Sequence, residues 1–376
     1  MNRRDLLVGG VALAAAPFVN RHRYRLFASQ QGTYSKRAID LVTTTTVIDM
    51  LSPFKIGQST WMQRPSDFTP ADLQRFRDSG ITVFHPAIGI GGVDAYTNVL
   101  RFLGLWNGFL AHHHDGLMRV DSAASLDRVK QTRKIGVVLG VQNAQHFRTP
   151  DDVDFFHALG QRVSQLTYNT RNMIGNGSTE RRDDGLSDFG VAVVQRMNKV
   201  GMVVDVSHCG DRTTLDAFEV SAKPVLITHS NCRALAKGHP RCKSDEAIQA
   251  MAKRGGVMGI TGVRMFVKVD EPTTIEHMLD HYDHVRALVG VQHLGLGSDM
   301  DLDGYDDLSA SELRGLRASY KDSYAFRDKI DIEGVDHPKR VFDLTEGLIR
   351  RRYTDAEIRG VLGDNFRRVV KEIWGG

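Results

Sequence analysis

The chain contains little cysteine, and this argues against a fold built on disulfides. Its 376 residues include three cysteines, Cys209, Cys232 and Cys242, an odd number without CxxC spacing. All three lie in or beside one stretch of the chain, where small polarizable side chains suit a packed site. A metal-thiolate role remains open as the second alternative.

Other missing patterns exclude further classes of protein. No basic stripe with interleaved aromatic residues is present, so we expect no nucleic-acid partner. No GxGxxG follows the first expected strand, which weakens a dinucleotide-binding hypothesis. No transmembrane run and no low-complexity tract interrupts the main part of the chain. The composition, 41% hydrophobic and 25% charged with a formal net charge of +4, is that of an ordinary globular protein.

The N-terminus carries a pattern of its own. Arg3 and Arg4 precede an apolar run from Leu6 to Phe18, which is shorter than the roughly 20 residues that a spanning helix needs. The segment resembles a twin-arginine export signal. We therefore expect a signal and tether over residues 1–30, a single metallo-hydrolase-like domain over 38–376, and a periplasmic or exported protein that is membrane-tethered if uncleaved. An N-terminal helix of the mature fold is the alternative.

Strand and helix patterns alternate about eight times along the rest of the chain. Apolar β-branched runs such as TTVIDML (45–51), ITVFHPAI (81–88), IGVVLGVQ (135–142) and RVSQLTYN (162–169) are separated by amphipathic helical patterns. Such alternation indicates βα units and a parallel sheet. We predict an α/β fold, a TIM-like (β/α)8 barrel with additional C-terminal helices. A doubly wound open sheet is the alternative.

The stretch from Met202 to Arg241 contains the strongest functional pattern. Two apolar runs, MVVDV and PVLIT, each lead to a histidine, His208 and His229. In a parallel sheet both side chains fall at the carboxyl ends of neighbouring strands, where α/β folds place their chemistry. Neutral imidazole is a good zinc ligand, and zinc makes water acidic enough to act as a nucleophile at neutral pH. The two histidines together therefore indicate a metal site.

Several motifs in order resemble those of a known family. DVSH, THSN, HPR and GLGSDMD, followed by GDNFRRVVKEIW near the C-terminus, are similar to the membrane dipeptidase (renal dipeptidase) family of zinc peptidases. The resemblance covers most of the chain beyond residue 40 and suggests a divergent bacterial exported member. It implies a TIM-like barrel with two zinc ions and a bridging hydroxide that attacks the peptide carbonyl of a dipeptide.

The resemblance also assigns roles to individual residues. His208 and His229 match the two histidines that hold the family's second zinc. Arg241 matches the arginine that pairs with the dipeptide carboxylate, a role that suits a bidentate guanidinium. Asp299 matches the aspartate proposed to hold the substrate amine or to shuttle a proton.

The sequence departs from the family pattern in the first half of the site. Residues 49–53 read DMLSP where the family has Asp-Gly-His-Asn-Asp, and the side chains of Leu51 and Pro53 cannot bind a metal. Gln142 replaces the bridging glutamate, and a neutral amide is a weak zinc ligand. Tyr168 replaces the histidine that polarises the substrate carbonyl, although its phenol can still donate a hydrogen bond. Asp49 shares the strand parity of Leu51 and is expected to face the barrel interior one layer deeper.

We therefore expect a hydrolase with one zinc ion rather than two, held by His208 and His229 and completed by Asp299, Gln142 or water. Its substrate would be a dipeptide or related small amide with a free carboxylate. One alternative is an enzyme that acts on a modified peptide without the two-zinc mechanism, with Tyr168, His208 and Asp299 as acid-base groups. Another is a non-catalytic protein that binds carboxylates or peptides. A homodimer also remains open.

Overall fold

Short strands and longer helices alternate through the computed structural model, which describes residues 34–57, 59–305 and 308–375. The expected export signal lies outside the described residues. The strands are β1 (Ile48–Asp49), β2 (Val83–Phe84), β3 (Ala87–Ile88), β4 (Leu117–Arg119), β5 (Ile135–Val137), β6 (Leu139–Val141), β7 (Gln161–Gln165), β8 (Val203–Asp205), β9 (Ile227–Ser230), β10 (Met258–Ile260) and β11 (Leu294–Leu296).

Helices alternate with the strands, as the sequence pattern predicts. They are α2 (Lys36–Thr44), α3 (Pro70–Asp78), α4 (Ala95–His112), α5 (Ala123–Arg128), α6 (Asp152–Ala158), α7 (Asp188–Val200), α8 (Asp211–Val220), α9 (Asp245–Lys253), α10 (Arg264–Val267), α11 (Ile275–Val289), α12 (Ala310–Ala318), α13 (Arg340–Arg350), α14 (Asp355–Arg359) and α15 (Asn365–Trp374). Within the described ranges, none of them combines the length and apolar character needed to cross a membrane.

The strands pair in parallel, and the pairing closes into a ring. One sheet has the order β4-β5-β2-β1-β11-β10-β9 and the other has the order β3-β6-β7-β8. The sheets share two strands, because β2 continues into β3 and β5 into β6 after short breaks. A parallel bridge between Asp205 and Leu226 joins β8 to the start of β9, and Leu226 N donates to Val204 O at 2.9 Å. With β4 as an outer strand, the described residues form the predicted (β/α)8 barrel.

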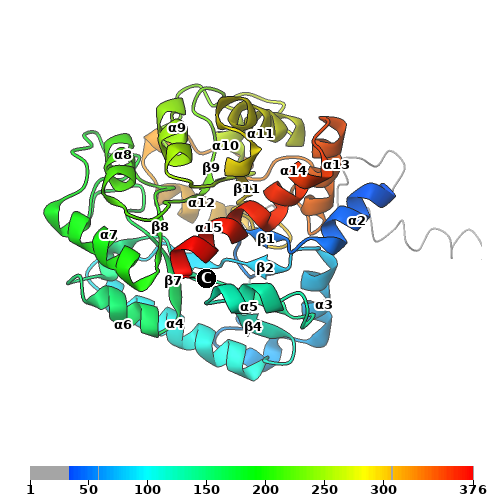
Figure 1. The fold of residues 1–376 in the computed structure, drawn as a ribbon, viewed down its shortest axis with the longest axis horizontal. Helices are drawn as coiled ribbons and strands as arrows, with labels where there is room; N and C mark the ends of the chain where they lie inside the picture. The colour runs from blue at the N-terminus through cyan, green and yellow to red at the C-terminus, as the bar shows by residue number, and fades with distance from the viewer. Residues whose placement is uncertain (1–33, 58, 306–307, 376) are drawn as a thin grey trace, which may run out of the picture.

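The last helix closes one end of this barrel. Four apolar side chains on one face of α15 are buried in a cluster with residues from the strands. These side chains are Phe366, Val369, Val370 and Ile373. Their partners include Val83, Val163, Val203, Leu226 and Val257, which come from different strands or lie next to them. Figure 1 shows α15 lying across the ring of strands while the other helices surround it. A functional site is therefore expected at the opposite end of the barrel, where the carboxyl ends of the strands lie.

Capping residues fix the boundaries of α3 and α7. The Thr69 side chain accepts a hydrogen bond from Asp72 N, and Asp72 in return accepts one from Thr69 N. The N-cap of α7 is Ser187, and the helix ends at Gly201, whose φ of +77° suits glycine. Each N-cap bond of this kind is worth about 1 kcal/mol.

The observed strands and helices differ from the predicted ones at several positions. The run at 81–88 is broken at His85 and Pro86, where proline has no N–H for the ladder. The run at 162–169 ends as a strand at Gln165, so Tyr168 lies in the following loop. β4 and α5 lie outside the predicted runs, and α12 lies in the polar region that follows β11.

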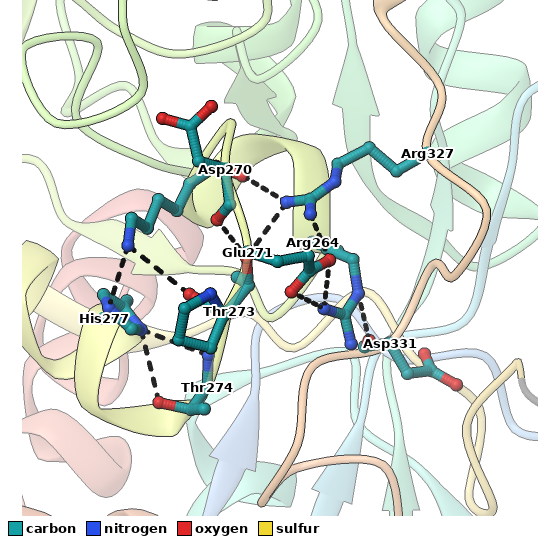
Figure 2. A network of polar contacts seen from close by, with 10 residues as sticks. Arg264, Asp270, Glu271, Thr273, Thr274, His277, Arg327 and Asp331 are labelled. Carbon is teal, nitrogen blue, oxygen red and sulfur yellow. Dashed lines mark hydrogen bonds and ion pairs between the residues drawn. The ribbon is translucent and has the colours of Figure 1, made fainter.

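The segment over residues 308–330 has a small core of its own. Tyr324 and Ile330 pack with Phe266 and with partly buried side chains of the same segment. Arg327 then ties the segment to the loop before α11, donating to Lys268 O at 2.7 Å and pairing with Glu271. Figure 2 shows Glu271 between Arg327 and Arg264, and Arg264 also donates to Asp331 O at 2.8 Å. These contacts hold the segment over the carboxyl end of the barrel.

Candidate functional site

His208 and His229 meet at the carboxyl end of the barrel. His208 lies three residues beyond β8, His229 lies within β9, and their Nε2 atoms are 2.9 Å apart. Both side chains are buried. Burial, followed by the positive charge of Arg241, lowers the pKa of both imidazoles well below the usual value. Both rings are therefore neutral, which is the form that binds metal.

The hydrogen bonds around His229 fix where its proton lies. Asp205 accepts from Ser207 Oγ at 2.6 Å and from Thr228 Oγ1 at 2.7 Å. Because the hydroxyl proton of Thr228 is engaged by Asp205, its oxygen accepts from His229 Nδ1 at 2.8 Å. The lone pair of His229 is therefore on Nε2. A carboxylate that orients a metal-binding histidine through a hydroxyl is a typical supporting arrangement.

Asn169 orients the His208 ring, as Thr228 orients the His229 ring. Its Oδ1 lies 2.7 Å from His208 Nδ1, and an Nδ1–H that donates to this oxygen leaves the lone pair of His208 on Nε2. Asn169 follows Tyr168 in the loop after β7 and has a φ of +59°, a conformation that asparagine tolerates better than most residues. Two nitrogen lone pairs thus face each other, and this arrangement requires a proton or a cation between them.

The pair fits one zinc ion. At Zn–N distances of 2.0–2.1 Å, two nitrogens of a tetrahedral site lie about 3.4 Å apart, so a small separation of the rings accommodates the ion. Within the described ranges, no group of three or more His, Cys, Asp and Glu side chains is placed to hold a metal. The remaining positions around an ion at His208 and His229 would therefore be filled by water, substrate or an amide.

The position that matches a first-site metal ligand of the family pattern carries no donor atom in this chain. Leu51 is buried and has no ligand atom. The expectation that Asp49 faces the barrel interior is wrong, because its carboxylate accepts from Ser298 N at 2.8 Å and Ser298 Oγ at 2.5 Å, and lies 4.0 Å from Arg340 at the start of α13. Met50 instead belongs to the cluster that α15 closes. Burial raises the pKa of Asp49 to about 6.

Gln142, the predicted amide ligand, lies at the same end of the barrel, just after β6. Its side-chain Nε2 is 3.5 Å from Ala87 O, and its backbone carbonyl oxygen accepts a hydrogen bond from Gln165 Nε2 at 2.6 Å. Within the described part of the chain, none of its hydrogen bonds reaches His208 or His229. The weak 3.5 Å contact would be easily exchanged for another partner.

Tyr168 covers His208. The two rings are stacked with centroids 4.2 Å apart and planes 20° from parallel. The Tyr168 hydroxyl forms a 2.8 Å hydrogen bond with the Tyr320 hydroxyl. Burial raises the pKa of Tyr168 well above its usual value, so the phenol keeps its proton at neutral pH. Sequence reasoning missed Tyr320, although three aromatics at 320, 324 and 326 in a polar stretch were a signal that this segment packs.

Arg241 supplies a buried positive charge beside the histidines. Its guanidinium donates to the carbonyl oxygens of Ser207 and His229, the latter at 2.9 Å, and it faces the Phe266 ring at 5.4 Å. No carboxylate of the described residues lies within 4.0 Å of it, and its Nε has no hydrogen-bond partner. A buried cation with no carboxylate in direct contact is suited to an anionic ligand.

Asp299 contributes a carboxyl group that titrates near neutrality. Burial raises its pKa to about 7, while Arg241 lowers it and Asp49 raises it. The backbone of Asp299 is held at a φ of +57°, and its N–H donates to Leu51 O at 2.9 Å. A carboxyl group with this pKa can both accept and return a proton at pH 7.

The cysteines near the site are thiols. All three are free and buried. Burial raises the pKa of Cys209 to about 11 and that of Cys242 to about 12. Within the described residues none of the three belongs to a group of His, Cys, Asp and Glu side chains that could hold a metal ion.

A cavity of about 440 Å³ opens beside Tyr168. Its walls come from the glycine-rich loop 89–92, from Asn143 and Gln145 after β6, from the loop after β7, and from residues 319–321. The volume lies in the range of ordinary small-molecule sites.

Known proteins with related sequences and structures support one family. The sequence matches the model described as Membrane dipeptidase (Peptidase family M19) over residues 37–313. It is 29% identical over 288 residues to dipeptidase verJ of Clonostachys rogersoniana, covering 75% of this chain and 67% of the relative. It is 25% identical over 265 residues to dipeptidase tcpJ of Claviceps purpurea (strain 20.1), covering 69% of this chain and 56% of the relative. The chain thus spans about two thirds or less of the length of these relatives.

The fold comparison agrees with the sequence match. The crystal structure of an amidohydrolase from Pseudomonas aeruginosa is similar, with a TM-score of 0.77 and 28% sequence identity. The similarity covers 90% of this chain and 99% of the amidohydrolase.

Proposed function

Because the chain belongs to the membrane dipeptidase family of metallopeptidases, we propose that it hydrolyses a dipeptide or a related small amide with a free carboxylate, using one zinc ion. The observation that carries this proposal is the pair of Nε2 lone pairs facing each other at 2.9 Å, with both Nδ1 atoms engaged as donors. Neutral, oriented imidazoles of this kind are metal ligands. The absence of ligand atoms at Leu51 and Pro53 supports one ion rather than two.

The surrounding residues have complementary roles in the proposed reaction. A zinc ion at His208 and His229 supplies a Lewis acid that promotes the ionisation of water near neutral pH. Arg241 binds the substrate carboxylate and thereby positions the scissile bond. Tyr168 donates a hydrogen bond to the carbonyl oxygen as negative charge develops there. Asp299 accepts a proton from the attacking water and returns it to the leaving amine as the C–N bond breaks.

Metal content and turnover test this proposal together. We expect the purified full-length protein to contain about one zinc per chain, because its structure offers one oriented pair of nitrogens. Elemental analysis measures the stoichiometry, and hydrolysis of Ala-Ala is followed before and after chelation. Two zinc ions per chain would contradict the loss of the first site. Activity that survives complete removal of metal would favour the metal-free alternative.

The pH profile tests the role of Asp299. Its pKa is raised to about 7, so the carboxylate form needed as a base accumulates above that pH, and kcat/KM should rise as the pH passes through about 7. The Asp299→Asn variant should lose this limb and about 10²–10⁴-fold in rate. Asp49→Asn should instead move the limb to lower pH, because the negative charge of Asp49 raises the pKa of Asp299. An unchanged limb in Asp299→Asn would assign the base to another group.

The cellular location remains a proposal on the sequence alone. We propose export through the twin-arginine-type segment at residues 1–30. That route accepts folded proteins and is compatible with metal uptake before export.

A further inference from the structure

The cavity beside Tyr168 has no part in the steps proposed above. The Tyr168 ring lines the cavity and also stacks on His208. The Tyr168 ring therefore lies between the cavity and His208. Tyr168 is thus a wall that the cavity and the histidine pair share.

The cavity is lined by neutral hydrogen-bonding groups. These side chains are amides and hydroxyls that come from three different segments, namely Asn143, Gln145, Asn169, Thr170, Thr179 and Ser319. Among the described lining residues Lys321 is the one that carries a charge, and its Nζ is already engaged by Glu180 Oε1 at 2.9 Å and Thr179 O at 3.2 Å. The lining thus offers hydrogen bonds without a free charge.

Glycines bring the backbone close to these side chains. A Cβ at Gly89 would lie 2.8 Å from the Tyr168 ring, and one at Gly91 would lie 2.9 Å from Asn143 Nδ2 and 3.1 Å from Gln145 Oε1. The N–H of Gly92 donates to Gln145 Oε1 at 3.1 Å. The glycine loop 89–92 therefore forms a close-fitting wall with polar backbone groups, which larger residues would displace.

The opposite wall is held in place by the packed segment over residues 308–330. Tyr320 reaches across to the Tyr168 hydroxyl at 2.8 Å. Beyond it, Arg327 is fixed by Glu271 and by Thr273 Oγ1, which accepts at 2.9 Å, as Figure 2 shows. Both walls are thus positioned before any ligand enters, so binding requires little ordering of the protein.

We propose that this cavity is a subsite for a neutral amide- or hydroxyl-bearing substituent of the substrate. This assignment rests on the proposed function. A charged substituent would lose its hydration here and find no free counter-charge, and an aliphatic one would leave the lining amides and hydroxyls unpaired. A site built from such groups discriminates strongly against analogues that lack the matching hydrogen bonds.

Matched dipeptides test the subsite through turnover. In the zinc-loaded full-length protein, kcat/KM is measured for dipeptides that carry Gln, Glu, Leu or Ala next to alanine, in both orders. Because Gln, Glu and Leu are similar in size, their ratio reports polarity and charge. We expect Gln to exceed Glu and Leu by about tenfold or more in one of the two orders, equivalent to one good hydrogen bond. Equal values for the three would overturn the subsite.

A variant assigns that preference to the cavity. Gln145→Leu removes an amide from the lining and should reduce the Gln-to-Leu ratio about tenfold. Gln292→Leu is the matched control, because Gln292 is exposed at the end of the molecule that α15 covers and should leave the ratio unchanged. A ratio that is the same in Gln145→Leu and in the native protein would contradict the assignment.

Binding separates failure of the subsite from failure of the proposed function. Calorimetry with the same peptides reports the cavity whether or not the bond is cleaved. Tighter binding of the Gln peptide without hydrolysis would support the subsite and reject the peptidase. Hydrolysis with equal affinity for the Gln and Glu peptides would support the peptidase and reject the subsite. Equal affinity without hydrolysis would reject both.

Discussion

Replacing His229 with alanine is expected to abolish zinc binding and hydrolysis together. The substitution removes one of the two Nε2 atoms that face each other at 2.9 Å, and within the described residues no His, Cys, Asp or Glu cluster can substitute for it. With zinc lost, activity should fall by at least about 10⁴-fold, since both the Lewis acid and the activated water are lost. Zinc per chain and kcat/KM with Ala-Ala measure the two effects in one preparation.

Two further variants show whether the loss is specific to the metal. His281→Ala removes another fully buried histidine, one that bonds Val267 O at 2.8 Å on the outer side of the barrel, and should cost stability while zinc is retained. Asp205→Asn leaves both imidazoles but disturbs the hydroxyls that orient His229, and should weaken zinc about 10–100-fold in competition with a chelator. Full zinc content in folded His229→Ala would refute the ligand assignment.

Replacing Arg241 with lysine should largely remove the preference for substrates with a free carboxylate. The guanidinium is oriented by the carbonyls of Ser207 and His229, and its Nε remains without a partner. A lysine ammonium cannot make these two bonds and bind a carboxylate bidentately as well. Loss of one partner of a buried charge pair costs about 2–5 kcal/mol. At about 1.4 kcal/mol per tenfold, kcat/KM should fall about 30- to 3,000-fold.

The comparison of acid and amide substrates isolates this effect. For the native protein, a dipeptide should be cleaved much faster than the corresponding dipeptide carboxamide, and Arg241→Lys should bring the two rates close together. Arg286→Lys is the matched control, because Arg286 on α11 pairs with Glu357 at 2.6 Å and lies over the Tyr353 ring, far from the substrate groups. Persistence of the native acid-to-amide ratio in Arg241→Lys would show that another group binds the carboxylate.

Local patterns in the sequence determined the barrel and half of the site. The apolar runs and the caps at Thr69 and Ser187 specify strands and helices because they depend on neighbouring residues alone. The alternation of these elements requires a parallel sheet, and a parallel sheet places His208 and His229 at one edge. The departures at Leu51 and Pro53 were equally visible, since a side chain without a ligand atom cannot bind a metal in any fold.

Tertiary structure alone decided the orientation of these groups. The tautomers of the two histidines follow from Asn169 and from Asp205 acting through Thr228, and the cover over His208 depends on Tyr320, which is 152 residues from Tyr168. Asp49 was misassigned because strand parity alone cannot show that Ser298 and Arg340 draw its carboxylate away from the barrel interior. Such contacts join residues that are distant in sequence, so no local pattern encodes them. The pKa of Asp299 is likewise set by burial and by distant charges, and these exist only once the chain has folded.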